Sequence, residues 1–201
     1  MSPLDSRQRI LDVAARLFHE QGYHATGVAT IQREAGVNPG TLYHFFASKE
    51  DLLQAVLERY RERLRPEVTD PAEDRTDDPL ERVFALLALY RHGLELTDCK
   101  QGCPIGNLAL ELADDHPEVR GLIDANFAGW LDVVEGWLAA AGDRIPPDVD
   151  RRELAVFVLT VLEGGIMQAR ARGRPEPFDA SVAQLRAYFD LLGARREAAS
   201  E

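Results

Sequence analysis

Cysteine is scarce in this sequence: its 201 residues include two, Cys99 and Cys103. Two cysteines are too few for a disulfide framework. A zinc site would need further ligands at close spacing, and this pair stands isolated. We therefore expect neither a metal ion nor a cofactor in this protein.

Long hydrophobic runs are also lacking. The sequence has no stretch of about 18 uncharged apolar residues, the length that a membrane-spanning helix needs. The N-terminal MSPLDSRQRI has no basic region followed by an apolar one, as a secretory signal would. These absences predict a cytoplasmic protein without a membrane partner.

The usual marks of an enzyme are missing as well. The sequence has no glycine-rich phosphate loop and no metal-ligand spacing. No serine or cysteine stands beside a histidine with an orienting acid. We therefore predict that the protein is not an enzyme.

Positive charge is in short supply, and the net charge is −11. Such a balance ordinarily opposes nucleic-acid binding, because phosphate repels an acidic protein. Residues 1–50, however, carry as many basic as acidic side chains, so residues 51–201 account for the whole net charge. An anion-binding site within the first 50 residues would therefore depend on local geometry.

Strand-like alternation is not sustained anywhere, whereas apolar residues recur at helical spacing, which predicts an all-α fold. A first helix is expected from about Ser6 to Gln21, ended by Gly22. The residues expected to begin the next three helices are Thr26, then Asn38 with Pro39, then Ser48. The acidic, proline-rich residues 66–79 have the composition of a solvated connector. Longer helices are expected over residues 80–94, 105–113, 119–138, 153–172 and 179–193.

Residues 37–52, VNPGTLYHFFASKEDL, combine an Asn-Pro-Gly opening with a Tyr-His pair. On a helix that starts at Pro39, apolar and polar residues take opposite faces: Leu42, Phe45 and Phe46 on one, and Gly40, Tyr43 and His44 on the other. After a tight turn, this division is typical of a helix-turn-helix whose third helix enters the DNA major groove. A helical hairpin in an ordinary bundle is the alternative.

The longer stretch TGVATIQREAGVNPGTLYHFFASKEDLL, residues 26–53, resembles the DNA-binding domain of the TetR-type family of bacterial transcriptional regulators. Gln32 departs from the pattern, which usually has a small residue there. The resemblance implies a helix-turn-helix domain over residues 1–50, joined by a long helix to a helical ligand-binding and dimerisation domain over residues 51–201. It also implies DNA contacts from Thr26, Asn38, Pro39, Gly40, Thr41, Tyr43, His44 and Lys49.

In that family the C-terminal part forms the homodimer. Residues 153–172 are apolar on more than one side, so this helix and the last one are candidates for a four-helix interface between two subunits. The residues that we expect there are Phe157, Val161, Gly164, Leu185, Tyr188, Phe189 and Leu192. Packing within one subunit is the alternative. Gly164 and Gly165 indicate a close helix approach or a bend beside a cavity.

The family's C-terminal part also holds a small effector. The segment GCPIGNLALEL, residues 102–112, resembles one that borders the effector region in one branch of the family. The predicted ligand-binding residues are Cys103, Asn107, Glu111, Phe127, Trp130 and Met167, although each aromatic side chain also fits a plain core. The expected ligand is apolar or aromatic, and a buried acid such as Glu111 or Glu163 would favour a cationic one.

Taken with the resemblance, these features predict a ligand-responsive repressor that binds a palindromic operator as a homodimer and is released by a small effector. Repression is adopted by analogy with the family. Two alternatives stay open. One is a redox-responsive regulator that acts through Cys99 and Cys103, and the other is a helical protein-interaction module without DNA binding.

Overall fold

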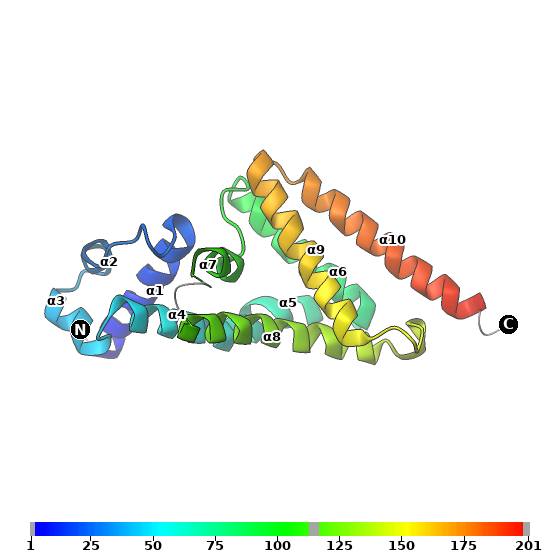
Figure 1. Ribbon diagram of the computed structural model, residues 1–201, viewed down its shortest axis with the longest axis horizontal. Helices are drawn as coiled ribbons and strands as arrows, with labels where there is room; N and C mark the ends of the chain where they lie inside the picture. Colours follow the sequence, from blue (N-terminus) through cyan, green and yellow to red (C-terminus); the bar gives the residue numbers. More distant parts are fainter. Residues whose placement is uncertain (1–2, 113–116, 199–201) are drawn as a thin grey trace. The chain divides into compact units, whose positions relative to one another are not determined.

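The computed structural model describes residues 3–112 and 117–198, and within these ranges it is all-α, as the periodicity predicts (Figure 1). The chain forms two compact units, each built from two separate segments. The first unit comprises Met1–Glu62 and Cys103–Phe127, and the second comprises Arg63–Gly102 and Ala128–Glu201. The predicted boundary at residue 50 therefore does not coincide with this division.

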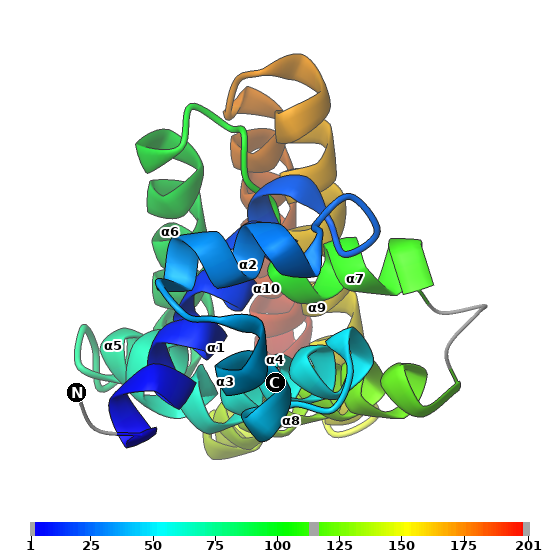
Figure 2. The ribbon, with the colours of Figure 1, turned by 90° about the vertical axis from the view of Figure 1, so that its left-hand side faces the viewer.

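The first unit brings helices from two distant parts of the sequence around one apolar core. They are α1 (Pro3–Gln21), α2 (Val28–Ala35), α3 (Pro39–Phe45), α4 (Lys49–Arg63), α7 (Pro104–Leu112) and the first part of α8 (Pro117–Ala140) (Figure 2). Fully buried Ile10, Leu42 and Leu53 share this core with Leu108 and Leu112 of α7. α7 is therefore a structural part of the N-terminal unit.

Local sequence accounts for several helix ends in this unit. α1 ends before Gly22, whose φ of +88° is a conformation that glycine adopts without strain. Ser48 caps α4, since its hydroxyl oxygen accepts the N–H of Asp51 at 3.0 Å. The predicted cap of α2 is wrong: its N-cap is Gly27, which makes no side-chain hydrogen bond, whereas the Thr26 hydroxyl turns back toward α1.

The second unit contains the remaining helices. They are the π-helix η1 (Leu64–Thr69), α5 (Asp70–Glu73), α6 (Pro79–Leu96), the rest of α8, the 3-10 turn η2 (Gly142–Arg144), α9 (Arg151–Arg172) and α10 (Glu176–Ala198). Asp78 and Asp150 cap α6 and α9: the Asp78 carboxylate accepts the Leu80 and Glu81 N–H groups, and the Asp150 carboxylate accepts the Glu153 N–H.

Residues 66–79 are not the solvated connector that their composition predicts. Most of them are helical, in η1 and α5, and Thr69 and Ala72 are fully buried. The Trp137 indole of α8 donates to the Glu73 carboxylate at 2.9 Å, which ties α5 to α8. Packing against neighbouring helices thus outweighs the composition of the segment.

α9 and α10 lie side by side in the second unit (Figure 1). Gly173, with φ of +65°, ends α9 and allows the chain to reverse. Within the described residues α9 has the length and composition of a membrane span, yet part of its apolar stretch is buried inside the unit, as in a core helix. Its apolar character is therefore consistent with a helix that packs on more than one side.

Candidate nucleic-acid interface and ligand sites

The N-terminus of α3 is built by its own sequence. Asn38 has an extended backbone, and its side-chain oxygen accepts the Thr41 N–H at 2.8 Å and the Thr41 hydroxyl at 3.1 Å. Pro39 follows as the first helical residue, where its missing N–H costs nothing. The predicted Asn38 cap is confirmed.

The two faces of α3 separate as the helical spacing predicts. Leu42 and Phe46 are buried and Phe45 is half-buried, so this side anchors α3 to the core of the first unit. The opposite side is exposed and carries Asn38, Pro39, Gly40, Tyr43 and His44. Tyr43 is 52% exposed, a high value for an aromatic side chain on a short helix with a well-packed inner face. This exposed set is hereafter the α3 outer face.

Thr26 does not belong to any outer surface. It is fully buried, and its hydroxyl donates to the carbonyl oxygens of Gly22, at 2.7 Å, and Leu17, at 3.2 Å. The expectation that its side chain contacts DNA is therefore wrong, because the hydroxyl satisfies backbone groups of the α1–α2 turn. Thr26 fixes the conformation of that turn.

Lys49 is half-buried and already engaged within the first unit. Its ammonium donates to the Tyr23 carbonyl at 2.6 Å and lies 4.0 Å from the centre of the Tyr23 ring. Burial lowers the pKa of Lys49 and raises the pKa of Tyr23. An ammonium has three donors, so a phosphate contact by Lys49 stays a prediction, beside a structural role that the sequence did not indicate.

Arg7 is a basic residue that the sequence analysis did not assign to the interface. It is exposed on α1, and its guanidinium lies 5.4 Å from the centre of the Phe46 ring, at the end of α3. A basic side chain in this place is suited to a phosphate beside the α3 outer face. Sequence spacing gave no sign of it, because α1 and α3 meet only in the fold.

The six residues predicted to bind a ligand divide between the two units. In the first unit, Cys103 is buried, Asn107 is half-buried, and Phe127 packs against the apolar core. Glu111 is not a free pocket acid: its carboxylate accepts the backbone N–H groups of Tyr23 and His24 at 2.9 and 2.6 Å. The Glu111 carboxylate is therefore already engaged within the protein, and a contact with a cationic ligand stays a prediction.

The other two residues lie in the second unit and differ sharply. Met167 is 60% exposed on the outer side of α9, so it does not line an enclosed cavity and its predicted ligand contact is not supported. Trp130 is 4% exposed, and its indole N–H has no acceptor among the residues that the structure describes. Burying such a donor without a partner costs about 1–3 kcal/mol.

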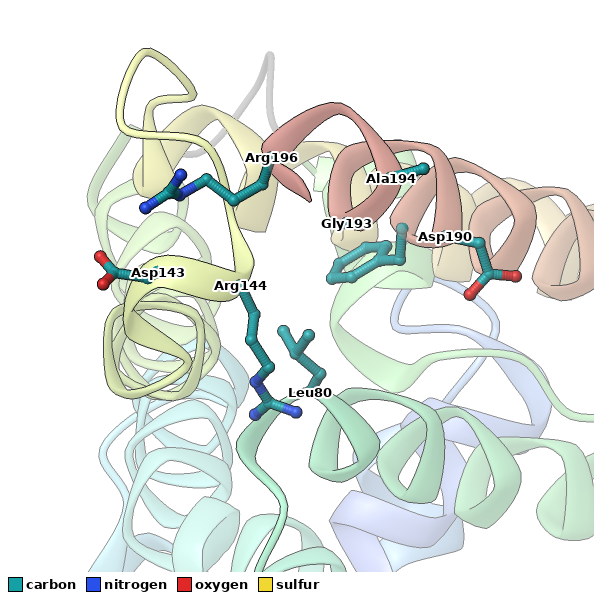
Figure 3. A pocket seen from close by; sticks show the side chains of 8 residues that line it. Leu80, Asp143, Arg144, Asp190, Gly193, Ala194 and Arg196 are labelled. Atoms are coloured by element: carbon teal, nitrogen blue, oxygen red, sulfur yellow. The ribbon is translucent and has the colours of Figure 1, made fainter. Parts of the chain in front are cut away.

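The second unit also has a hollow of about 780 Å³ between the start of α6, η2 and the end of α10. It is lined by none of the six predicted residues. Figure 3 shows Leu80 and Arg144 on one side of it, and Gly193 and Ala194 of α10 on the other. Arg144 is also held by Asp78, with nitrogen-to-oxygen distances of 2.7 and 2.9 Å.

The residues predicted at a dimer interface fall into two groups. Leu185, Phe189 and Leu192 are buried within the second unit, and Phe189 packs edge-on against Phe84 of α6. Their assignment to an interface is therefore wrong: they form core between α10 and its neighbours. Phe157 and Tyr188 are 43% and 39% exposed and contact each other edge-to-face, with Val161 and Gly164 half-buried nearby on α9.

The α3 outer face and its buried support define a helix-turn-helix unit, and the all-α remainder places the protein among the two-part helical DNA-binding regulators. Residues 10–56 match the family model of bacterial regulatory proteins of the tetR family, and residues 79–184 match that of the C-terminal domain of LmrA/YxaF-like transcriptional regulators. The chain belongs to the TetR family of transcriptional regulators, and it is a regulator and not an enzyme.

Two relatives illustrate the similarity. The HTH-type transcriptional regulator LmrA of Bacillus subtilis is 33% identical over 168 residues, which cover 83% of this chain and 87% of LmrA. An uncharacterised HTH-type transcriptional regulator of Mycobacterium tuberculosis is 32% identical over 186 residues, which cover 90% and 92% of the two chains.

Solved structures show the same fold. A TetR transcriptional regulator from Chloroflexus aurantiacus has a TM-score of 0.81 at 26% identity, covering 94% of this chain and 96% of its own. The TetR family regulator CifR, in complex with a 26-base-pair operator DNA, has a TM-score of 0.75 at 26% identity, covering 90% and 95%.

Proposed function

We propose that the protein is a dimeric repressor that binds a roughly palindromic operator in the cytoplasm and is released from it by a small effector. The observation that carries the DNA-binding part is the α3 outer face. It leaves Tyr43 and His44 exposed beside a closely packed core, on the helix that enters the major groove in helix-turn-helix proteins. CifR with its operator DNA supports the same reading.

Tyr43 and His44 supply different kinds of contact. The Tyr43 hydroxyl donates a hydrogen bond to a phosphate, or its ring lies against a thymine methyl group, and His44 follows on the same exposed side. The first 50 residues are electrically neutral, and the rest of the chain is acidic. Repulsion between the acidic part and DNA therefore keeps non-specific binding weak, so that operator binding depends on the few contacts of α3.

The exposed apolar side of α9 and α10 supports the homodimer. Its large exposed side chains are Val156, Phe157, Met167, Tyr188 and Leu191. Such a patch on two adjacent helices fits a four-helix interface with a second copy. Two copies related by a two-fold axis present their α3 helices about 34 Å apart, one turn of DNA, which is why the operator is expected to be a rough palindrome.

A footprint on the DNA that flanks the gene, repeated across a salt series, tests the DNA-binding part. The expected result is a two-fold symmetric protected site whose affinity falls steeply with salt. Tyr43→Ala is expected to weaken binding by about 1–3 kcal/mol and to leave thermal stability nearly unchanged, because the side chain is exposed. Absence of any protected site for the folded protein, or a large loss of stability in Tyr43→Ala, would contradict the proposal.

Trp130 carries the effector part of the proposal. Its buried indole N–H lacks a partner among the described residues, so an apolar or aromatic ligand with a hydrogen-bond acceptor would satisfy it. For release, the ligand must bind more tightly to a state of the protein that does not fit the operator. Cys99 and Cys103 are both buried, which gives the redox alternative no support, because redox-sensing thiols are ordinarily accessible to solvent.

A matched pair of tryptophan variants tests this assignment. Trp137 is also buried but its indole N–H is paired with Glu73, so Trp137→Phe is the control for Trp130→Phe. Aromatic compounds with carbonyl or hydroxyl groups are screened for release of the operator fragment. Trp130→Phe is expected to weaken that response about tenfold, the loss of one hydrogen bond, while Trp137→Phe keeps it. If both tryptophan variants release the operator fragment equally well, Trp130 does not bind the effector. If Gly193→Leu, which fills the hollow beside η2, then abolishes the release, the effector site lies in that hollow.

A further inference from the structure

Glu111 connects α7 with the helix-turn-helix through the backbone. Its two carboxylate oxygens accept the N–H groups of Tyr23 and His24 at 2.9 and 2.6 Å. These two amides lie in the turn between α1 and α2, more than 80 residues earlier in the chain. Charged acceptors make the stronger hydrogen bonds in proteins, so this pair of contacts is a firm link between the two segments.

The turn is shaped to receive the carboxylate. Gly22 has φ of +88°, and a Cβ atom at this position would lie 3.0 Å from one Glu111 oxygen and 3.3 Å from the other. A side chain at residue 22 would therefore collide with Glu111 as well as strain the backbone. The buried Thr26 hydroxyl holds the same turn from the inside through the Gly22 carbonyl.

The other side of the Tyr23 residue is held by Lys49. The Lys49 ammonium donates to the Tyr23 carbonyl at 2.6 Å and packs over the Tyr23 ring. Lys49 is the first residue of α4 and follows closely after α3. A continuous path thus runs from Glu111 of α7 through the backbone of Tyr23 to the residue that begins α4, shortly after α3 ends at Phe45.

Apolar packing supports the same path. Leu108 and Leu112 of α7 are buried in the core that also holds Leu42 of α3 and Leu52 of α4. α7 is therefore rigidly part of the unit that carries α3, and Glu111 on its half-exposed side adds a polar contact with defined direction. A change in the position of α7 would act directly on Tyr23 and, through Tyr23, on Lys49.

We propose that Glu111 is a positioning residue for operator recognition: it holds the α1–α2 turn and, through Tyr23, Lys49, so that α3 is presented at the angle that the major groove requires. This inference rests on the proposed DNA-binding function. It assigns to Glu111 a role at the DNA interface, although no part of the side chain lies on the α3 outer face.

Glu111→Gln tests the role with little change in shape. The N–H groups of Tyr23 and His24 face different oxygens of Glu111, and in glutamine one of these oxygens becomes an NH2 group, which cannot accept the N–H that faces it. The turn therefore loses one of its two restraints. The expected result is a loss of operator affinity of about tenfold, as for a hydrogen bond to a charged group, with affinity for unrelated DNA unchanged. Glu118→Gln is the control, because Glu118 is an exposed acid of the same unit and its hydrogen bond from the Gln54 amide is long, at 3.5 Å.

Two further measurements separate positioning from plain stabilisation. Hydrogen exchange at the Tyr23 and His24 amides is expected to speed up in Glu111→Gln and not in Glu118→Gln. Lys49→Met combined with Glu111→Gln is expected to cost clearly less operator affinity than the two single losses added together, because both act through Tyr23.

The outcomes are distinct. Operator affinity within twofold of the wild type in Glu111→Gln overturns the positioning role, as does an equal loss for operator and unrelated DNA, or a loss that tracks a lowered melting temperature. Strict additivity with Lys49→Met overturns the path through Tyr23. If the wild-type protein itself fails to protect any operator, the proposed function fails first, and the amide exchange shows by itself whether the Glu111 contacts exist.

Discussion

At the scale of single residues, the side chains that follow local rules were the predictable ones. Asn38 and Ser48 cap helices because each stands just before a helix with a free backbone N–H within reach. The buried position of Thr26 and the structural role of Lys49 could not be predicted, for the opposite reason. A hydroxyl or an ammonium can turn toward solvent or toward a backbone carbonyl, and the choice depends on chain segments that are distant in sequence.

Asp78 gives a pH-dependent prediction. It caps α6 and pairs with Arg144, and this hydrogen bond, with those from the Leu80 and Glu81 amides, lowers its pKa from 3.8 to about 2. Because the folded-state pKa is depressed, the ionised carboxylate stabilises the fold fully above pH 3.8, and the contribution is lost as the pH falls toward 2.

Asp78→Ala is therefore expected to lower the free energy of unfolding at pH 7 by about 1 kcal/mol, the usual worth of a cap. The half-exposed pair with Arg144 adds little to this. Urea unfolding at several pH values measures the free energy of unfolding of both proteins. The difference between Asp78→Ala and the wild type should shrink below pH 4. Asp77→Ala, which removes an exposed neighbouring charge, is the control. A difference that stays constant down to pH 2 would contradict the assignment.

At the scale of elements, the adjacent residues Gly164 and Gly165 of α9 differ in how much space surrounds them. A Cβ at Gly165 would lie 3.0 Å from the Phe178 ring and 3.4 Å from its Cα, so Gly165 permits the close approach of α10 to α9. A Cβ at Gly164 would meet no atom within 4 Å in the described part of the structure. Of the two predicted meanings of this pair, close helix approach is confirmed.

Gly165→Ala is expected to destabilise the protein by about 1–3 kcal/mol, because Phe178 is buried and its backbone cannot easily yield. Gly164→Ala makes the same chemical change one residue earlier and is expected to be neutral or to stabilise by up to about 1 kcal/mol through helix propensity. Thermal unfolding of both variants, with helix content followed by circular dichroism, compares them directly. Equal effects in the two variants would show that the close approach is not what Gly165 provides.

The segment at residues 66–79 marks the limit of composition as a guide to elements. Its prolines and acids are typical of a connector, yet it forms η1 and α5 and buries Thr69 and Ala72. The deciding contact is the Glu73 carboxylate with the Trp137 indole, and the two residues are 64 positions apart. No local pattern in the sequence indicates that pairing.

At the scale of the whole molecule, the proposed homodimer leads to a prediction about assembly. Phe157→Glu places a charge in the exposed apolar patch of α9 and α10, where it would have to be buried without a partner on dimerisation. The variant is expected to be monomeric by light scattering, to keep its helix content, and to lose about a hundredfold or more of operator affinity, since one α3 helix alone provides half of the contacts.

Leu96→Glu is the control for this change. Leu96 is 74% exposed at the end of α6, away from the α9 and α10 patch in sequence, so the same charge there is expected to leave the assembly intact. A Phe157→Glu protein that stays dimeric with normal operator affinity would show that the subunits meet elsewhere.

The sequence by itself determined the helical class, most helix ends, the division of α3 into a buried and an exposed face, and the family. These follow from contacts between residues that are three or four positions apart, which a periodic pattern records directly. Only the tertiary structure decided that α7 belongs with the helix-turn-helix, that Glu111 holds the α1–α2 turn, and that Leu185, Phe189 and Leu192 are core. Those outcomes depend on which distant segments share a core. Every residue except proline has a backbone N–H group, so the sequence does not show which of these groups pairs with an acid that the fold brings near.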